Sequence, residues 1–249
     1  MAVLDVGAGT GAITAGIARA VGPSGTVLGI DRDETMIRLA RQRHAGVANL
    51  AFELLDVLEL RDEVRFDVVT AARALQWIED PARALRGMHA ATRAGGMAVV
   101  LEYTHADLIW EPAPPEPVRR FYDAFLAWRN ANGWDNRLGD HLPGLFADAG
   151  FRDVVVTVED EVARRGEPGF TDALELWQQV METMGTTIAD AGFLAQTDLL
   201  AARAAHRSWA AYDARLLAEP VHEEAVRRVN GEDGDHHVAE DAERGHASE

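Results

Sequence analysis

Carboxylates and glycines stand together near the start of the chain, at spacings that suit nucleotide chemistry. Asp5 comes at the end of a short apolar strand, and the loop Gly7-Ala8-Gly9-Thr10-Gly11 follows it before a helix predicted over 12–21. Glycine permits the positive φ angles of a tight turn and lets backbone N–H groups approach a ligand closely. The loop therefore predicts a nucleotide cradle.

Two further carboxylates, Asp31 and Asp56, follow the next two predicted strands, over 26–30 and 50–55. The two oxygens of Asp31 match the vicinal hydroxyls of a ribose. If the strands are parallel, Asp5, Asp31 and Asp56 meet at one edge of the sheet. That edge would form an acidic pocket suited to a cation.

Two kinds of ligand fit the cradle. Gly7-x-Gly9-x-x-Ala12 followed by Asp31 satisfies the loose dinucleotide fingerprint. Arg32 would suit the 2′-phosphate of NADP, although an arginine at a helix start is more often solvated. Asp5 argues against a dinucleotide, because its charge is poorly matched to a pyrophosphate. S-adenosylmethionine, which carries an ammonium and a sulfonium group, suits the acidic edge better.

The pattern Asp-x-Gly-x-Gly-x-Gly, from Asp5 to Gly11, resembles motif I of the class I S-adenosylmethionine-dependent methyltransferases. The resemblance implies that Asp5 and the glycine loop hold the methionine end of the donor, and that Asp31 binds its ribose. It also implies that Asp56 accepts a hydrogen bond from the adenine amino group while Val57 packs against the ring.

The resemblance continues to about residue 160. After a fourth strand over 66–71, Ala72 and Arg73 resemble the family's residues that face the methyl donor, and Trp77 stands in its aromatic place. Ala94-Gly95-Gly96 resembles a Pro-Gly-Gly turn, and we expect the two glycines to cap a helix over 81–93 before a strand over 97–102. Residues 149–154 resemble the late helix-to-strand segment, which predicts a sixth strand over 151–158.

Alternating strands and helices predict a doubly wound, Rossmann-like α/β fold with a mostly parallel sheet, the class I methyltransferase fold, and a helical C-terminal addition. We expect a donor-binding domain over 1–160, a mainly helical part over 161–229 and a disordered acidic tail over 230–249. A seventh strand has only a weak candidate, over 225–229. The later helices are predicted over 118–132, 142–149, 171–184 and 196–217.

The amino-acid composition excludes several kinds of catalytic and metal site. The chain has 249 residues, a net charge of −17, no cysteine and, among its basic residues, no lysine. These absences exclude disulfides, thiolate metal sites, a cysteine nucleophile and Schiff-base chemistry. No metal site is expected, and the acidic charge argues against a nucleic-acid partner. Without an apolar run of membrane length or a leader, the sequence predicts a cytoplasmic protein that does not associate with membranes.

The predicted function is S-adenosylmethionine-dependent methyl transfer to a small-molecule acceptor. An NAD(P)-dependent oxidoreductase and a non-catalytic, methyltransferase-like binding module remain as alternatives. The general base stays unassigned, with Glu102, His105, Tyr122 and His141 as candidates. The oligomeric state also stays open, a homodimer included. Only two residues precede the first strand, where the family carries a helix over the donor, so another segment must supply that cover or donor affinity is expected to be low.

The predicted helix over 118–132 carries an aromatic stripe whose place in the fold is open. Phe121, Tyr122, Phe125 and Trp128 recur at helical spacing. Such a stripe is more often core than binding surface, yet the segment after the fifth strand commonly lies over the ligand-binding edge of the sheet. The sequence therefore leaves two interpretations, a core and a pocket wall.

Overall fold

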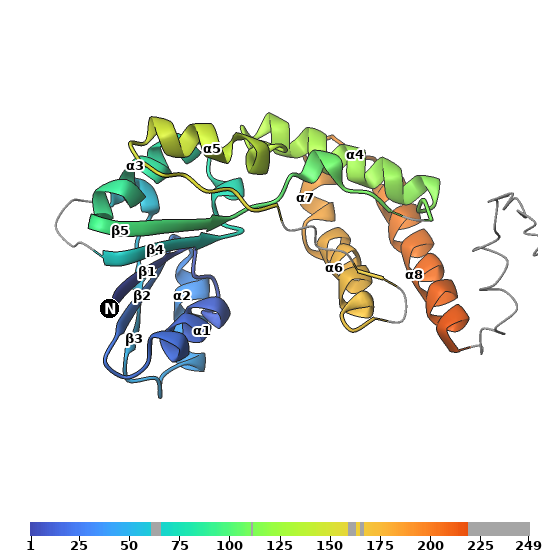
Figure 1. Cartoon of the computed structure of the whole chain (residues 1–249). Helices are drawn as coiled ribbons and strands as arrows, with labels where there is room; N and C mark the ends of the chain where they lie inside the picture. The colour runs from blue at the N-terminus through green and yellow to red at the C-terminus, as the bar shows by residue number, and fades with distance from the viewer. Residues whose placement is uncertain (61–65, 111, 159–162, 165–166, 219–249) are drawn as a thin grey trace, which may run out of the picture.

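The computed structural model describes residues 1–60, 66–110, 112–158, 163–164 and 167–218 (Figure 1). Its centre is a sheet in the order β3-β2-β1-β4-β5, and every neighbouring pair of strands is parallel. This confirms the predicted doubly wound fold. The strands are β1 (Ala2–Val6), β2 (Thr26–Asp31), β3 (Leu50–Leu54), β4 (Phe66–Ala72) and β5 (Thr92–Leu101).

Helices cover both faces of the sheet because successive side chains of a strand point to opposite sides. Val3 of β1 packs in a cluster with Ala18 of α1 (Ala12–Val21), and α2 (Glu34–Arg43) buries its own apolar side chains in an adjacent cluster. Leu4 points the other way, into the main core. That core is completed by α3 (Pro81–Ala91) and α5 (Leu138–Asp148). We call the sheet and these four helices the sheet layer.

Local sequence signals start the helices where the structure has them. The Asp33 carboxylate accepts hydrogen bonds from the backbone N–H groups of Thr35 and Met36, at 2.7 and 3.2 Å, and so caps α2. Asp80 caps α3 in the same way, and Pro81 occupies the first turn, where its missing N–H costs nothing. Three short 3-10 helices follow strands β3, β4 and β5, namely η1 (Val57–Glu59), η2 (Leu75–Trp77) and η3 (His105–Asp107).

The remaining helices form a second unit, the helical layer, beside the sheet layer (Figure 1). Its core is aromatic. The ring centroids of Tyr122 and Trp177 lie 4.9 Å apart, and those of Trp110 and Tyr122 lie 4.8 Å apart. The aromatic stripe of the sequence is therefore core in the described structure. The helices are α4 (Glu116–Ala131), α6 (Phe170–Thr183), α7 (Gly185–Asp190) and α8 (Gln196–Ala218).

The predicted sixth strand is wrong. Residues 151–158 form no strand, and Val155 and Val158 are 86% and 84% exposed. Valine-rich segments favour strands because their side chains pack well on a pleated, half-buried surface. Among the described residues, no backbone pairs with this segment as a strand. The sequence pattern indicates only the local preference of the segment for an extended backbone. It does not indicate whether a second strand lies beside it.

The predicted capping role of Gly95 and Gly96 is also wrong. Helix α3 ends at Ala91, where the Thr92 N–H bonds the carbonyls of Met88 and His89, and β5 begins at once. Gly95, with φ of +75°, lies within β5, where the register shifts between the pairs Phe66↔Thr92 and Val68↔Met97. The two glycines therefore allow a bulge in the strand.

Several expectations lie beyond what the structure describes. Residues 225–229 and the tail 230–249 are outside the described residues. The division into 1–160 and 161–229 stays a prediction, although α4, which belongs to the first of these ranges, supplies its aromatic side chains to the helical layer. None of the described helices combines the length and the apolar character that crossing a membrane requires.

Candidate functional site

The glycine loop folds back on the end of β2. The N–H groups of Gly7 and Ala8 both donate to the Ile30 carbonyl at 2.9 Å, and Gly7, Gly9 and Gly11 have φ angles of +72°, +53° and +82°. A Cβ on Gly7 would lie 2.3 Å from the Ala74 Cβ, whereas a Cβ on Gly9 would meet nothing within 4 Å. Gly7 thus serves close packing, and Gly9 faces open space.

The other end of the loop is fixed by packing as well. A Cβ on Gly11 would lie 2.6 Å from the ring of Phe52, and Gly11 begins α1. The carbonyl of Thr10 lies 3.3 Å from Nε2 of His44. The loop is therefore held at both ends, and its middle is left free to meet a ligand.

Asp5 lies beneath the loop, with 2% of its surface exposed. Its carboxylate accepts hydrogen bonds from the hydroxyls of Thr14, at 2.6 Å, and Thr70, at 2.8 Å. Burial raises the pKa of Asp5, while the two hydroxyls act in the opposite direction. Asp5 thus links β1 to α1 and β4, and the direct contact with the donor that the sequence predicts stays a prediction.

Asp31 connects the glycine loop to the end of β2. One carboxylate oxygen accepts the Gly9 N–H at 2.9 Å, and the other accepts the Asp33 N–H at 2.9 Å. Its exposed neighbour Arg32 donates to the Trp77 carbonyl at 3.3 Å. Arg32 therefore contacts the chain that follows β4.

Asp56 and Val57 lie at the end of β3 and differ in their surroundings. Asp56 is half-buried and accepts the Leu58 N–H at 2.9 Å, which caps η1. Val57 is buried in the main core of the sheet layer. The structure thus leaves Asp56 at the edge and places the Val57 side chain below it, so the expected packing of Val57 against adenine stays a prediction.

Residues 73–77, which we call the post-β4 turn, complete this edge. Ala72 ends β4 opposite Leu101 of β5, and the Arg73 N–H donates to the Leu101 carbonyl at 2.8 Å. Arg73 has a φ of +59°, unusual for a residue with a side chain, and its guanidinium lies 4.9 Å from the ring centroid of Tyr103. The turn touches the glycine loop through Ala74.

Two charged residues lie beneath the turn, the partly buried Glu102 and the fully buried Arg129. Sequence reasoning made Glu102 a candidate base and assigned no role to Arg129. The Leu75 N–H donates to Glu102 Oε1 at 2.6 Å, and the fully buried Arg129 donates to the Gln76 carbonyl at 3.1 Å. The position of Arg129, four residues after Phe125 on the apolar side of α4, was the available signal.

Burial changes the acid–base properties of this region. Desolvation raises the pKa of Glu102 to about 7, against the opposing effects of backbone N–H groups of the turn and of Arg129. It lowers the pKa of His105 to about 4, aided by repulsion from Arg129. It also raises the pKa of Tyr122, whose hydroxyl donates to the His105 carbonyl at 2.5 Å.

The candidate bases are thus divided. His105 Nε2 lies 2.5 Å from Oε1 of Gln76 in the post-β4 turn, and Glu102 accepts the Leu75 N–H of the same turn. Tyr122 reaches the turn only through His105, whose carbonyl accepts its hydroxyl. His141 instead lies at the surface, paired with Asp135. The geometry favours the first three over His141.

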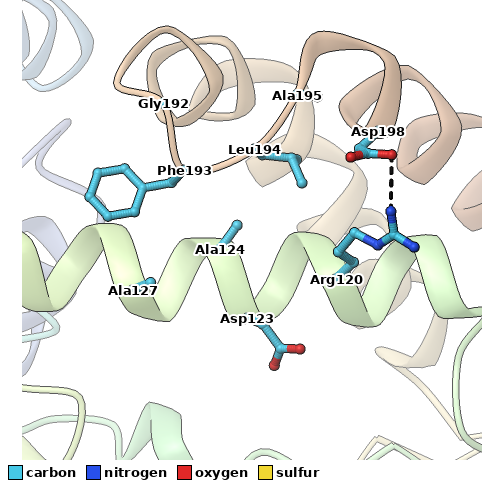
Figure 2. A pocket seen from close by; sticks show the side chains of 9 residues that line it. All are labelled: Arg120, Asp123, Ala124, Ala127, Gly192, Phe193, Leu194, Ala195 and Asp198. Carbon is cyan, nitrogen blue, oxygen red and sulfur yellow. Dashed lines mark hydrogen bonds and ion pairs between the residues drawn. The ribbon is translucent and has the colours of Figure 1, made fainter.

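A separate hollow of about 410 Å³ lies between α4 and the segment joining α7 to α8 (Figure 2). Arg120 and Asp198, paired at 3.2 Å, lie at one end, and Phe193 and Leu194 lie along the wall opposite Ala124. The hollow contains none of the predicted site residues. In the described part of the chain, no group of three His, Cys, Asp or Glu residues could hold a metal ion.

Sequence comparisons give the family. The model of a methyltransferase domain family matches residues 1–137. Demethylmenaquinone methyltransferases of Staphylococcus carnosus and Staphylococcus epidermidis are 29% and 30% identical, over 61% of this chain and 68% of their own. A ubiquinone/menaquinone biosynthesis C-methyltransferase of Proteus mirabilis is 32% identical over 49% of this chain and 48% of its own.

Solved structures share the fold. Phosphoethanolamine N-methyltransferase 2 of Haemonchus contortus, in complex with phosphomonomethylethanolamine and S-adenosylhomocysteine, superimposes with a TM-score of 0.53 and 18% identity. The match covers 86% of this chain and 46% of that one. The [4+2]-cyclase SpnF gives a TM-score of 0.53 with 22% identity, over 84% of this chain and 70% of that one. At these identities the likeness concerns the fold alone.

Proposed function

The chain belongs to the class I S-adenosylmethionine-dependent methyltransferases, and from this premise we propose where its donor lies and which acceptor it methylates. It is a methyltransferase that uses S-adenosylmethionine and acts on a small molecule. We propose that the donor lies along the carboxyl ends of β1, β2 and β3. We propose further that the acceptor is a small aromatic molecule of the quinol type.

One observation carries the proposed donor site, namely the arrangement of Gly9 and Asp31. The middle of the glycine loop faces open space at Gly9, while the Asp31 carboxylate lies beside it at 2.9 Å from its N–H. The Gly9 N–H is bonded to this carboxylate, and each carboxylate oxygen keeps a further lone pair for a ligand on the open side of the loop, which suits the hydroxyls of a ribose. The edge between β1 and β4 is also the switch point of the sheet, where ligands of such folds bind.

Each predicted site residue has a proposed role. The backbone from Gly7 to Gly11 holds the methionine end, with Ala72 and Arg73 on the opposite wall. Asp31 binds the ribose and Asp56 the adenine, while Asp5 acts indirectly because Thr14 and Thr70 occupy its oxygens. Arg32 and Val57 then support the site through the post-β4 turn and the core.

Methyl transfer makes modest chemical demands on these residues. The sulfonium of the donor is already a strong electrophile, so the protein mainly aligns the nucleophile with the methyl group and excludes water. The proposed acceptor class comes from the quinone-methylating relatives. His105 is neutral at physiological pH, but burial and Arg129 lower its pKa to about 4 and make it a weak base, so we assign no general base.

The first test is thermal unfolding of the chain alone and with S-adenosylhomocysteine, S-adenosylmethionine, NAD or NADP, each at about 1 mM. A ligand at about 100 times its dissociation constant adds about 2.7 kcal/mol to the free energy of unfolding. We expect a higher midpoint with the adenosylmethionine pair only. A shift with NAD or NADP alone would instead support an oxidoreductase.

The acceptor is tested by transfer of a labelled methyl group. We expect label in a hydroxylated naphthalene or benzene ring and none in phosphoethanolamine, which serves as the matched polar acceptor. Labelling of phosphoethanolamine alone would overturn the proposed acceptor class and leave the donor site standing. Donor binding without transfer to any acceptor would support a non-catalytic binding module.

We also propose, from the composition alone, that the protein works in the cytoplasm without a nucleic-acid partner. The sequence leaves its oligomeric state open, a homodimer included, and light scattering would measure the mass of the assembly in solution.

A further inference from the structure

The post-β4 turn lies between the proposed donor site and the helical layer. On one side, Ala74 packs closely on Gly7: a Cβ added to Gly7 would lie 2.3 Å from the Ala74 Cβ. On the other side, Arg129 of α4 donates to the Gln76 carbonyl, and its guanidinium lies 4.7 Å from the Trp77 ring. Any displacement of this turn therefore moves the wall against which the glycine loop rests.

Glu102 anchors the turn from below. It directly follows β5, and its Oε1 accepts the Leu75 N–H at 2.6 Å. The neighbouring N–H groups of Gln76 and Ala74 also stabilise its charged form. Several N–H groups that converge on one carboxylate bind it far more strongly when it is ionised. Glu102 thus sets the position of the turn according to its charge.

The groups that face Glu102 leave its charge open to change. Arg129 favours the ionised form and burial opposes it, so the pKa of Glu102 lies at about 7. His105 of η3 is uncharged at that pH, since its pKa lies at about 4. Among the described residues, Glu102 Oε2 and Arg129 Nη1 are buried side-chain atoms without a hydrogen-bond partner. Both side chains therefore have bonding capacity that the described residues leave unmet.

We propose that Glu102 is a positioning residue for donor binding: its carboxylate fixes the post-β4 turn, and through Ala74 the turn fixes Gly7 and the glycine loop. Glu102 touches neither donor nor acceptor in this scheme. Because the ionised carboxylate holds the turn more firmly, donor affinity rises as Glu102 loses its proton. We infer this on the basis of the proposed donor site.

The test measures S-adenosylhomocysteine binding by calorimetry from about pH 6 to about pH 8.5, a range in which Glu102 titrates and ordinary carboxyl groups do not. We expect the dissociation constant of the unaltered protein to fall about tenfold across this range. The Glu102→Gln variant should bind about tenfold more weakly than the unaltered protein at the upper end, with no pH dependence. The matched control is Glu79→Gln, at an exposed carboxylate just after η2, which should behave like the unaltered protein.

Two further controls separate Glu102 from other ionisable groups near the loop. His44 contacts the Thr10 carbonyl, and burial raises the pKa of Asp5 beneath the loop, so the pH series is repeated with His44→Gln and with Asp5→Asn, and the pH dependence should persist in both. Loss of the dependence in either control, or its retention in Glu102→Gln, would overturn the proposal. If Glu102→Gln does not fold, the series on the unaltered protein and on these two controls decides alone, because a flat profile would contradict the proposal. Absence of binding at every pH would instead defeat the proposed donor site.

Discussion

Polar side chains have opposite surroundings at the carboxyl edge of the sheet layer and in the core of the helical layer. At the edge, Asp31 and Asp56 bond the N–H groups of nearby loops and stay partly exposed. In the helical layer, Arg129 is fully buried, with its guanidinium within 6 Å of the rings of Trp77, Phe125 and Trp134. The carboxylates at the edge are therefore accessible to a ligand. Arg129 has no contact with solvent, so it depends on its bonds within the protein.

The largest effect is expected from Arg129→Met, which tests the buried side of this comparison. The substitution leaves Glu102 without its counter-charge and removes the bond to Gln76. The Gln76 carbonyl and Asn136 Oδ1 each lose a buried donor, which costs roughly 1 to 3 kcal/mol of the free energy of unfolding for each group, measured by urea denaturation. The control is Arg120→Met on the same helix, at an exposed ion pair, which should change stability little. Equal losses in both variants would mean that burial does not distinguish the two arginines.

A slightly smaller effect is expected from Gly7→Ala, which tests the close contact between the glycine loop and the post-β4 turn. Gly7 and Gly22 share a φ of +72°, but only at Gly7 does an added Cβ meet another atom within 4 Å. Gly22→Ala should cost about 1 to 2 kcal/mol for the backbone alone. Gly7→Ala should cost roughly 1 to 3 kcal/mol more, because Ala74 must move. Similar unfolding midpoints for the two variants would contradict the contact.

The edge itself is tested by Asp31→Ala. We expect S-adenosylhomocysteine to bind about tenfold more weakly, from the loss of a charge-assisted hydrogen bond. The control is Asp33→Ala, two residues on, which caps α2 and should lower the free energy of unfolding by about 1 kcal/mol while donor affinity is retained. The comparison fails if Asp33→Ala weakens donor binding as much as Asp31→Ala does.

The smallest effect concerns the pH dependence of stability, because two contributions oppose each other. The pKa of His105 is lowered to about 4, so its contribution to stability is present above the unfolded pKa of 6.5 and is lost as the pH falls toward 4. The pKa of Glu102 is raised to about 7, so its contribution is present below 4.5 and is lost as the pH rises through 7. Between these limits the two changes offset each other, so the pair together should contribute a nearly constant amount to the free energy of unfolding of the unaltered protein.

His105→Gln removes one of the two contributions. In this variant Glu102 is the one member of the pair that still titrates, so its contribution should raise the free energy of unfolding by about 1 to 3 kcal/mol as the pH falls from about 7 to about 4.5. Urea denaturation at each pH measures the change, and the exposed His141→Gln serves as the control. An unaltered profile in His105→Gln would show that His105 does not titrate against Glu102.

The sheet layer was predictable because its signals are local. The apolar runs, Asp33, Pro81 and the glycine spacing each act on the residues beside them, and four predicted strands and the first helices lie within a few residues of their observed places. The doubly wound order followed from the alternation of strands and helices. At the site, the positions of Asp31 and Asp56 at the strand ends were predicted in the same way.

What could not be predicted depends on partners distant in sequence. The segment 151–158 has the composition of a strand, but it pairs with no strand in the part of the chain that the structure describes. Helix α7 is too short for its periodicity to show, and the burial of Arg129 depends on Trp77, Trp134 and Glu102 from three other segments. Asp5 stands at the predicted strand end, but only the structure showed that two threonines occupy its oxygens.

The central position of β1 has a consequence for how the protein folds. β1 pairs with β2 close by in the chain, but also with β4, which lies much further along, and closing that longer loop is entropically the more expensive step. Until β4 docks, Thr70 does not reach Asp5 and Ala74 does not reach Gly7. We therefore expect the proposed donor site to form only once β4 has docked, so a bound donor would mark a sheet whose central pairing is complete.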